Sequence, residues 1–164
     1  MKRKFCSLIL IVMAFSASAD FSGRIVRVLD GDTVEMLEPG NQLTRIRLAG
    51  IDAPEKSQPF GQRSRQELSS MVAQRYVTVT GSDKDRYGRL LGTVWIGVTD
   101  VNAEQIRKGL AWAYRYHGKP VRPDYAVLEA EARRQSVGLW SEPGQTEPWR
   151  WRSLHQDGLK KNND

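Results

Sequence analysis

The sequence has almost no sulfur or imidazole with which to build a metal or redox centre. Its 164 residues contain one cysteine, Cys6, and two histidines, His117 and His155. The histidines lie far apart, without the spacing typical of zinc or iron ligands. Cys6 lies in an N-terminal segment that we expect to be removed, which leaves the mature chain without a thiol. These absences exclude disulfide and thiolate chemistry in the mature protein and leave oxygen atoms as the available metal ligands.

Long hydrophobic runs are also scarce, and the one that occurs is typical of a signal peptide. The first 19 residues combine a basic start, an apolar run from Phe5 to Phe15 and the small residues Ala17-Ser18-Ala19. The apolar run is too short to cross about 30 Å of hydrocarbon as a helix, which argues against a membrane anchor. We therefore expect the mature chain to begin at Asp20 and the protein to be exported, either to the periplasm or as a secreted protein.

Neither sign of charge dominates the chain. The formal net charge is +6, and it falls to +3 when Lys2, Arg3 and Lys4 leave with the signal segment. This mildly basic balance is compatible with a nucleic-acid partner but does not identify one. The length suits one domain, which we expect to span residues 20–154. The polar residues 155–164, rich in Lys and Asn, are expected to form a disordered tail.

Hydrophobic patterning predicts a β-rich α+β fold. Two alternating runs in "GRIVRVLDGDTVEML" meet at Asp30-Gly31, which predicts a β-hairpin. Further strands are expected at residues 42–49, 76–81 and 89–96, and helices at 62–74, 101–108 and 124–136. Five short strands with a helix between the third and the fourth predict a five-stranded Greek-key barrel of the oligonucleotide-binding type, with three helices.

Carboxylates gather at two points of this predicted fold. Asp30 and Asp32 lie at the hairpin turn, while Asp52 and Glu55 follow the third strand in "RIRLAGIDAPE", where Pro54 stiffens the chain. If the third strand pairs with the hairpin, these acids share one end of the sheet. Clustered carboxylates either raise their pKa values or bind a hard cation such as calcium or magnesium. A solvated surface turn is the alternative interpretation of the second acidic segment.

Two arginines lie where they could bind an anion beside a cation held by these acids. Arg47 lies on the strand that leads into the acidic segment, and Arg89 follows the "DRYG" turn. A guanidinium binds phosphate oxygens in a bidentate way and keeps its charge at any working pH. Carboxylates, a cation and arginines together indicate a site that cleaves phosphodiesters, with a free carboxylate to activate water. Ordinary surface ion pairs are the alternative for both arginines.

Three blocks of the sequence, "LDGDTVEM", "RIRLAGIDAPE" and "DRYGRLLG", resemble in order and spacing the signature blocks of the staphylococcal nuclease family. The likeness continues through "VNAEQIRKGLAWAYRY" and "EARRQSVGLW", so it covers about residues 23–140. The segment "EPWRWR" is similar to the end of short bacterial members. The resemblance implies an oligonucleotide-binding barrel with three helices. It also implies calcium-dependent hydrolysis of both DNA and RNA that leaves 3′-phosphate ends.

The resemblance also implies metal ligands and a catalytic group. Asp32 and Asp52 would bind calcium, together with the main-chain carbonyl of Ala53. The family's best-known member has threonine at the position of Ala53, but only the main-chain oxygen is required there. Glu55 would be the general base or the group that orients water. Asp30 would be an acid close to the metal without binding it directly.

The remaining implied residues would contact the nucleic acid. Arg47 and Arg89 would hold the scissile phosphate, and three tyrosines match positions that line the nucleotide pocket: Tyr87, Tyr114 and Tyr116. On spacing alone, the last two tyrosines fit equally well as packing residues on a strand face. The segment "WRWR", residues 149–152, could stack on bases and bind phosphates, although packing of its tryptophans on the barrel is the favoured interpretation.

Two functions are compatible with these residues. The first is an exported, calcium-dependent endonuclease, active as a monomer on DNA and RNA. The second is a barrel of the same fold that binds nucleic acid without cleaving it. A binding protein needs aromatic and basic residues but has no use for the full set of acids and arginines. The presence of that set favours the enzyme.

Overall fold

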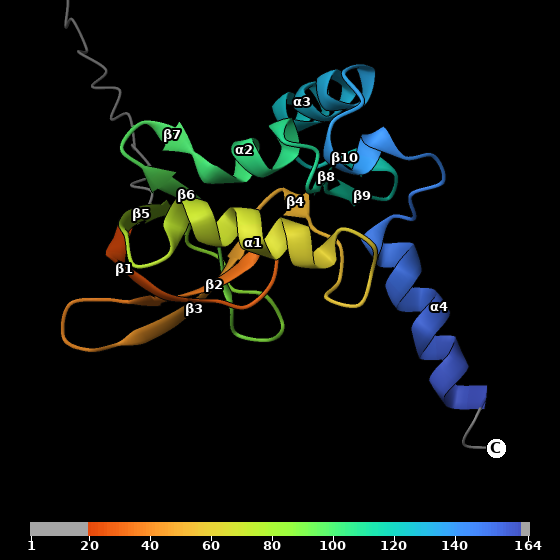
Figure 1. Ribbon diagram of the computed structural model, residues 1–164. Coiled ribbons are helices and arrows are strands. Elements are labelled where there is room, and N and C mark those ends of the chain that lie inside the picture. The colour runs from red at the N-terminus through yellow and green to blue at the C-terminus, as the bar shows by residue number, and fades with distance from the viewer. Residues whose placement is uncertain (1–19, 162–164) are drawn as a thin grey trace, which may run out of the picture.

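A computed structural model of the protein describes residues 20–161 and confirms the predicted barrel (Figure 1). Its five strands are β1 (Asp20–Val28), β2 (Thr33–Leu37), β3 (Leu43–Leu48), β5 (Tyr76–Thr80) and β6 (Leu90–Ile96). Neighbouring strands pair antiparallel in the order β3-β2-β1-β5-β6, and a parallel pairing of β3 with β6 closes the barrel. The predicted signal segment, residues 1–19, and residues 162–164 lie outside the described part of the chain.

The predicted hairpin is formed by β1 and β2, and alternating residues of the barrel strands fill its interior. Ile25 of β1 pairs with Met36 of β2, and both side chains are fully buried. The same alternation continues around the barrel, with Val34, Ile46, Leu48, Val79 and Val94 also buried. The period-two pattern of the sequence therefore specified which face of each strand turns inward.

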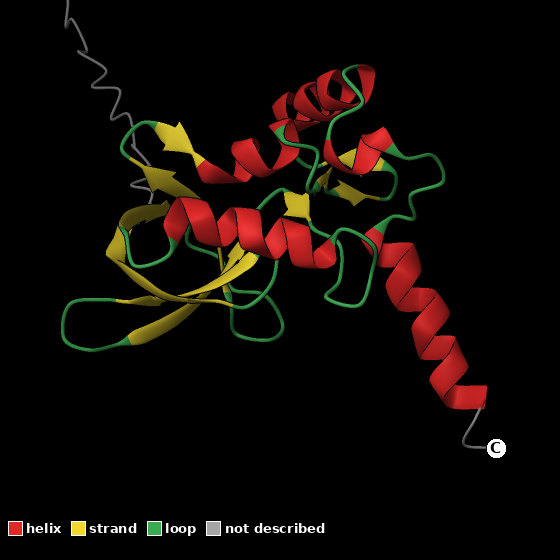
Figure 2. Ribbon diagram, in the orientation of Figure 1, coloured by secondary structure: helices red, strands yellow, loops and turns green. Residues whose placement is uncertain are grey.

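Three helices lie where the sequence predicts them: α1 (Gly61–Val72), α2 (Val101–Arg107) and α3 (Pro123–Arg134). The side chain of Asp100 caps α2 by accepting a hydrogen bond of 2.9 Å from the Ala103 amide. Gly109 ends the same helix region at a φ of +63°, a conformation that glycine adopts without strain. Figure 2 shows α1 lying across the strands, with α2 and α3 above it in this view. None of the helices within residues 20–161 is long and apolar enough to cross a membrane.

Several two-residue strands lie outside the predicted set, and one pair of them carries part of the site. β4 (Ile51–Asp52) pairs antiparallel with β8 (Trp112–Ala113), and β9 (Arg115–Tyr116) pairs with β10 (Lys119–Pro120). β7 (Thr99–Asp100) extends the main sheet beside β6, and a short 3₁₀ helix covers Gly138–Ser141. Strands this short have no readable period, so only the fold reveals them.

The buried carboxylate of Glu129 fixes β8 to α3. It accepts a hydrogen bond of 2.7 Å from the Ala113 amide and forms ion pairs with Arg115 and Arg133. Because β8 pairs with β4, this carboxylate supports the strand that carries Asp52. The sequence shows Glu129 only as a charged residue on a helix.

A fourth helix, α4 (Pro148–Lys161), follows the barrel, where the sequence predicts three helices and a disordered tail from residue 155. Pro148 occupies its first position, where the missing amide hydrogen costs nothing. The residues that follow are polar but include good helix formers such as Gln and Lys, so a polar composition suits an exposed helix as well as a disordered tail. Figure 1 shows α4 leaving the body of the protein, with only its beginning close to the barrel.

Candidate active site

The loop between β1 and β2, residues 29–32, is held from behind by two helices. The side-chain amide of Gln105 on α2 donates hydrogen bonds to the Gly31 carbonyl, at 2.7 Å, and to the Ser64 carbonyl on α1, at 3.1 Å. A Cβ atom built on Gly31 would lie 2.0 Å from the Ser64 hydroxyl oxygen. Only glycine allows the loop to approach α1 this closely. The acids on either side of Gly31 are therefore held in a fixed position.

Asp32 is buried and fully engaged in hydrogen bonds. Its Oδ1 accepts from the Thr33 hydroxyl at 3.0 Å, and its Oδ2 accepts from the Ala53 amide at 2.7 Å. Asp30 accepts from the Asp32 amide at 3.1 Å. Burial, together with the neighbouring charge of Asp32, raises the pKa of Asp30 to about 7. The raised pKa of Asp30 reflects both its burial and the repulsion between the two acids of this loop.

Asp52 reaches the same place from β4. Gly50, at a φ of +75°, turns the chain after β3, and Asp52 then pairs with Trp112 of β8. Its side chain is only 1% exposed. A carboxylate buried to this extent is not part of a solvated surface turn, so that alternative interpretation is excluded for Asp52.

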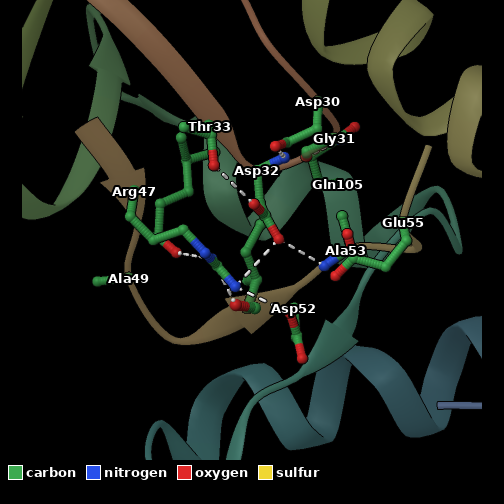
Figure 3. A network of polar contacts seen from close by, with 12 residues as sticks. Asp30, Gly31, Asp32, Thr33, Arg47, Ala49, Asp52, Ala53, Glu55 and Gln105 are labelled. Carbon is green, nitrogen blue, oxygen red and sulfur yellow. Dashed lines mark hydrogen bonds and ion pairs between the residues drawn. The ribbon is translucent and has the colours of Figure 1, made fainter. Parts of the chain in front are cut away.

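Arg47 joins the two buried aspartates. It lies on β3 opposite Thr33 of β2, which places it beside the acidic loop. Figure 3 shows its guanidinium between the carboxylates, with Nη2 3.0 Å from Asp32 Oδ2 and 2.9 Å from Asp52 Oδ1. Nη1 donates to the Leu48 and Ile51 carbonyls at 2.8 and 2.9 Å. Arg47 therefore belongs to the site rather than to an exposed ion pair on the barrel surface.

Glu55 lies just outside this buried group, on the loop between β4 and α1 (Figure 3). Its carboxylate is 40% exposed and is bound by Arg152 of α4, with Nη1 2.7 Å from Oε1. The same guanidinium contacts Asp52, with Nη2 2.7 Å from Oδ2. Sequence reasoning missed this role of Arg152, since the "WRWR" segment pointed only to nucleic-acid contacts or to packing tryptophans. The contact joins residues about 100 positions apart, and no local pattern encodes such a pairing.

Arg89 and the tyrosines lie outside this network of contacts. Arg89 precedes β6 and forms an ion pair of 2.7 Å with Asp85, close to the ring of Tyr87. Tyr87, Tyr114 and Tyr116 are all exposed. β6 pairs with β3 so that Leu91 lies opposite Arg47, and Arg89 therefore lies just before the strand next to the site. The main-chain amide of Tyr114 donates to the Gly50 carbonyl at 2.9 Å, which keeps this residue beside the turn before Asp52.

The donors of this site suit a hard cation. Within residues 20–161 no three or more His, Cys, Asp or Glu side chains form a group able to hold a metal ion. The metal ligands implied by the family resemblance include only two carboxylates, Asp32 and Asp52. The third ligand is the main-chain oxygen of Ala53. Two buried carboxylates drawn together, with oxygen as the sole donor element, fit calcium or magnesium and not a transition metal. In the structure, arginine side chains neutralise these carboxylates.

Comparison with known proteins agrees with the geometry of this site. Residues 45–142 match the family model described as staphylococcal nuclease homologue. The chain is 47% identical to Protein ParB of Escherichia coli, over 93% of this chain and 90% of that protein. It is 45% identical to a protein named micrococcal nuclease from Shigella flexneri, over 92% of this chain and 91% of that protein. It is 46% identical to an uncharacterized endonuclease of Escherichia coli, over 92% of this chain and 97% of that protein.

The match of sequence and fold confirms the resemblance found in the three sequence blocks. The closed five-stranded barrel is the fold of that family, and the matched residues include Arg47, Asp52, Glu55 and Arg89. The chain therefore belongs to the staphylococcal nuclease family, a family of metal-dependent hydrolases of phosphodiester bonds.

Proposed function

We propose that this protein is an exported, calcium-dependent endonuclease that hydrolyses DNA and RNA and leaves 3′-phosphate ends. The observation that carries the proposal is the convergence of Asp32, Arg47 and Asp52 at one end of the barrel, with Glu55 at the edge of that group. The names of the relatives, micrococcal nuclease and endonuclease, support the same activity.

Asp32, Asp52 and the Ala53 carbonyl are the residues that would hold the calcium ion. When bound, the ion supplies positive charge that polarises the phosphate and stabilises charge that develops on its oxygens. Both aspartates are buried. Asp32 is held by its hydrogen bonds to the Thr33 hydroxyl and the Ala53 amide, and Asp52 by its contacts with Arg47 and Arg152, so the oxygens are in place before a cation arrives. The choice of calcium rests on the oxygen donors and on the predicted export, because calcium is plentiful outside cells.

Glu55 activates the attacking water in this proposal. Its carboxylate is partly exposed, next to the buried acids, so it can reach both solvent and a phosphate bound at the site. Arg47 donates to the scissile phosphate through its Nη2 atom, which contacts both Asp32 and Asp52 in this structure. Arg89 contributes a second guanidinium from the turn that precedes β6, where Asp85 orients it in the absence of substrate.

The exposed tyrosines provide the surface for the nucleotides. Tyr87, Tyr114 and Tyr116 present rings to solvent, and stacking of bases on such rings tolerates any base sequence. Contacts to phosphate and base stacking do not involve the 2′-hydroxyl, the group that distinguishes RNA from DNA, which fits cleavage of both. We expect the mature protein to act as a monomer without a membrane anchor, either in the periplasm or secreted.

The test is digestion of heat-denatured DNA and of RNA by the mature protein from Asp20 onward. Each polymer is incubated with calcium, with magnesium and with a calcium chelator, and the product ends are analysed for 3′-phosphate. We expect both polymers to be cleaved with calcium and to remain intact with the chelator. Tight binding without cleavage under any cation would instead identify a nucleic-acid-binding barrel.

A further inference from the structure

We propose that Arg152 is a positioning residue for the hydrolysis, because it holds the Glu55 carboxylate in place beside Asp52. The proposal rests on the role assigned to Glu55 above. It adds a residue from α4, outside the segment that the family model matches, to the residues on which turnover depends.

Arg152 bridges the two acids with its whole guanidinium. Nη1 donates to Glu55 Oε1 at 2.7 Å and to Asp52 Oδ1 at 3.2 Å, while Nη2 donates to Asp52 Oδ2 at 2.7 Å. The bond to Asp52 is bidentate, which fixes the plane of the guanidinium. Asp52 is itself held by Arg47 and by the β4–β8 pairing, so Arg152 is anchored on a rigid residue.

The Glu55 side chain depends on this bridge for its position. Among the described residues, Arg152 is the only hydrogen-bond or ion-pair partner of the Glu55 carboxylate. The loop between β4 and α1 contains no strand or helix of its own. Without the bridge, the carboxylate is free to occupy several rotamers, most of which point away from a phosphate beside Asp52.

The segment that carries Arg152 also holds the main chain of Glu55. The buried side chain of Gln58 accepts from the Glu55 amide at 3.1 Å and donates to the Thr146 carbonyl at 2.6 Å. Residues 146–152 are therefore linked to Glu55 in two ways: directly through the Arg152 side chain, and indirectly through Gln58, which bonds both Thr146 and the Glu55 main chain. A direct and an indirect link from one segment to one acid indicate a positioning role and not a chance surface ion pair.

The placement of α4 agrees with this role. Arg152 is in the second turn of the helix, and the rest of α4 leaves the body of the protein (Figure 1). Trp149 and Trp151 are half-buried beside it, and the Trp151 ring stacks on His155 of the same helix. The contact with the acids thus comes from the docked beginning of α4, where the Glu55 and Arg152 side chains are each 40% exposed.

The first measurement compares Arg152→Gln with Arg150→Gln, a matched control on the same helix. Arg150 is exposed, and its one ion pair within the described part of the chain is with Glu147 on its own segment, at 3.4 Å. We expect Arg152→Gln to lower kcat roughly 10- to 100-fold, the order of effect that follows from a misplaced catalytic group, with a smaller change in KM. The control should leave kcat unchanged. Arg152→Lys should restore part of the rate, because an ammonium can contact both acids but cannot make the bidentate pair.

A double-mutant cycle shows whether Arg152 acts through Glu55. If it does, Arg152→Gln has almost no further effect on kcat in a Glu55→Gln protein, because the positioned group has already lost its function. An equal reduction in both backgrounds would mean that Arg152 acts on the substrate itself, which would overturn the proposal. Tighter calcium binding by Arg152→Gln with undiminished turnover would also overturn it, because the guanidinium would then be a competitor of the metal.

A second readout needs neither metal nor activity. Amide hydrogen exchange of the metal-free protein should be faster over residues 55–61 in Arg152→Gln than in the parent, and unchanged in Arg150→Gln. The affected amides include those of Gln58 and Gly61, which are bonded within this loop at 2.9 Å each. Unchanged hydrogen exchange in Arg152→Gln would refute the proposal that Arg152 holds Glu55 in position. A parent protein that cleaves neither DNA nor RNA would refute the proposed function. The exchange experiment would still show whether Arg152 stabilises the loop that carries Glu55.

Discussion

The close approach of Gly31 to α1 predicts that a single added methyl group disturbs both stability and the metal site. In Gly31→Ala, the new Cβ would lie 2.0 Å from Ser64 Oγ and 2.8 Å from both Ser64 Cβ and Ala53 Cβ. Carbon atoms normally approach to about 3.5 Å, so the loop must move outward even if the Ser64 hydroxyl rotates away. The movement carries Asp32, the next residue.

The size of the effect follows from the contacts that the movement disturbs. Overpacking of a tight site costs about 1–3 kcal/mol. The bonds from Gln105 to the Gly31 carbonyl and from Ser64 to the Leu110 carbonyl, 2.7 Å each, are weakened as well, at about 1 kcal/mol each. We expect the free energy of unfolding to fall by roughly 3 kcal/mol, which lowers Tm by roughly 10 °C in a domain of this size. Calcium affinity should fall at least about tenfold, as for other changes behind a metal ligand.

Thermal unfolding of the metal-free protein followed by circular dichroism measures the first effect, and calorimetric calcium titration measures the second. Gly40→Ala is the control, because Gly40 has a φ of +85° but nothing within 4 Å of an added Cβ. Gly40→Ala should lower the free energy of unfolding only by the backbone strain, about 1–2 kcal/mol, and should leave calcium affinity unchanged. A Gly31→Ala protein no less stable than this control, or one with parental calcium affinity, would refute the packing argument.

Three further predictions concern the catalytic group, a guanidinium and the folded state. Glu55→Gln should keep the parental Tm and nucleotide affinity while turnover falls by several orders of magnitude; near-parental turnover would contradict its role. Arg89→Ala should lower kcat without loss of folding, measured by rate assay and circular dichroism, whereas an unfolded variant would support a structural role. Glu129→Ala should lower the free energy of unfolding by about 1–3 kcal/mol in urea titrations, because the buried Ala113 amide loses its acceptor; Glu129→Gln, which keeps an acceptor, should cost less.

The last prediction concerns the stability of the folded protein at low pH. Hydrogen bonding from Arg45 lowers the pKa of the buried Glu35 below 4.5. The resulting stabilisation is therefore fully present above pH 4.5 and is lost as the pH falls toward the lower pKa of the folded state. Urea midpoints should decline less steeply below that pH in Glu35→Gln than in the parent. An equal decline in both proteins would show that this carboxylate does not contribute.

The sequence by itself determined the barrel and the identity of the acidic site. Alternating residues in β1, β2 and β3 depend on a local property, the period of the strand, so their inward faces could be read directly. Asp32, Asp52, Glu55 and Arg47 lie in short contiguous blocks, and a block keeps its residues and spacing visible in the chain. The pairing of Thr33 with Arg47 then followed from the register of two adjacent strands.

Only the tertiary structure decided which distant residues complete that site. Arg152 and Glu129 read as ordinary charges in polar segments, and their roles come from contacts with residues far away in the chain. Gly31 suited a tight turn on sequence grounds, but its necessity comes from the distance to Ser64 on another element. Such contacts depend on how helices and strands pack together, and packing leaves no periodic signal in the segments that it joins.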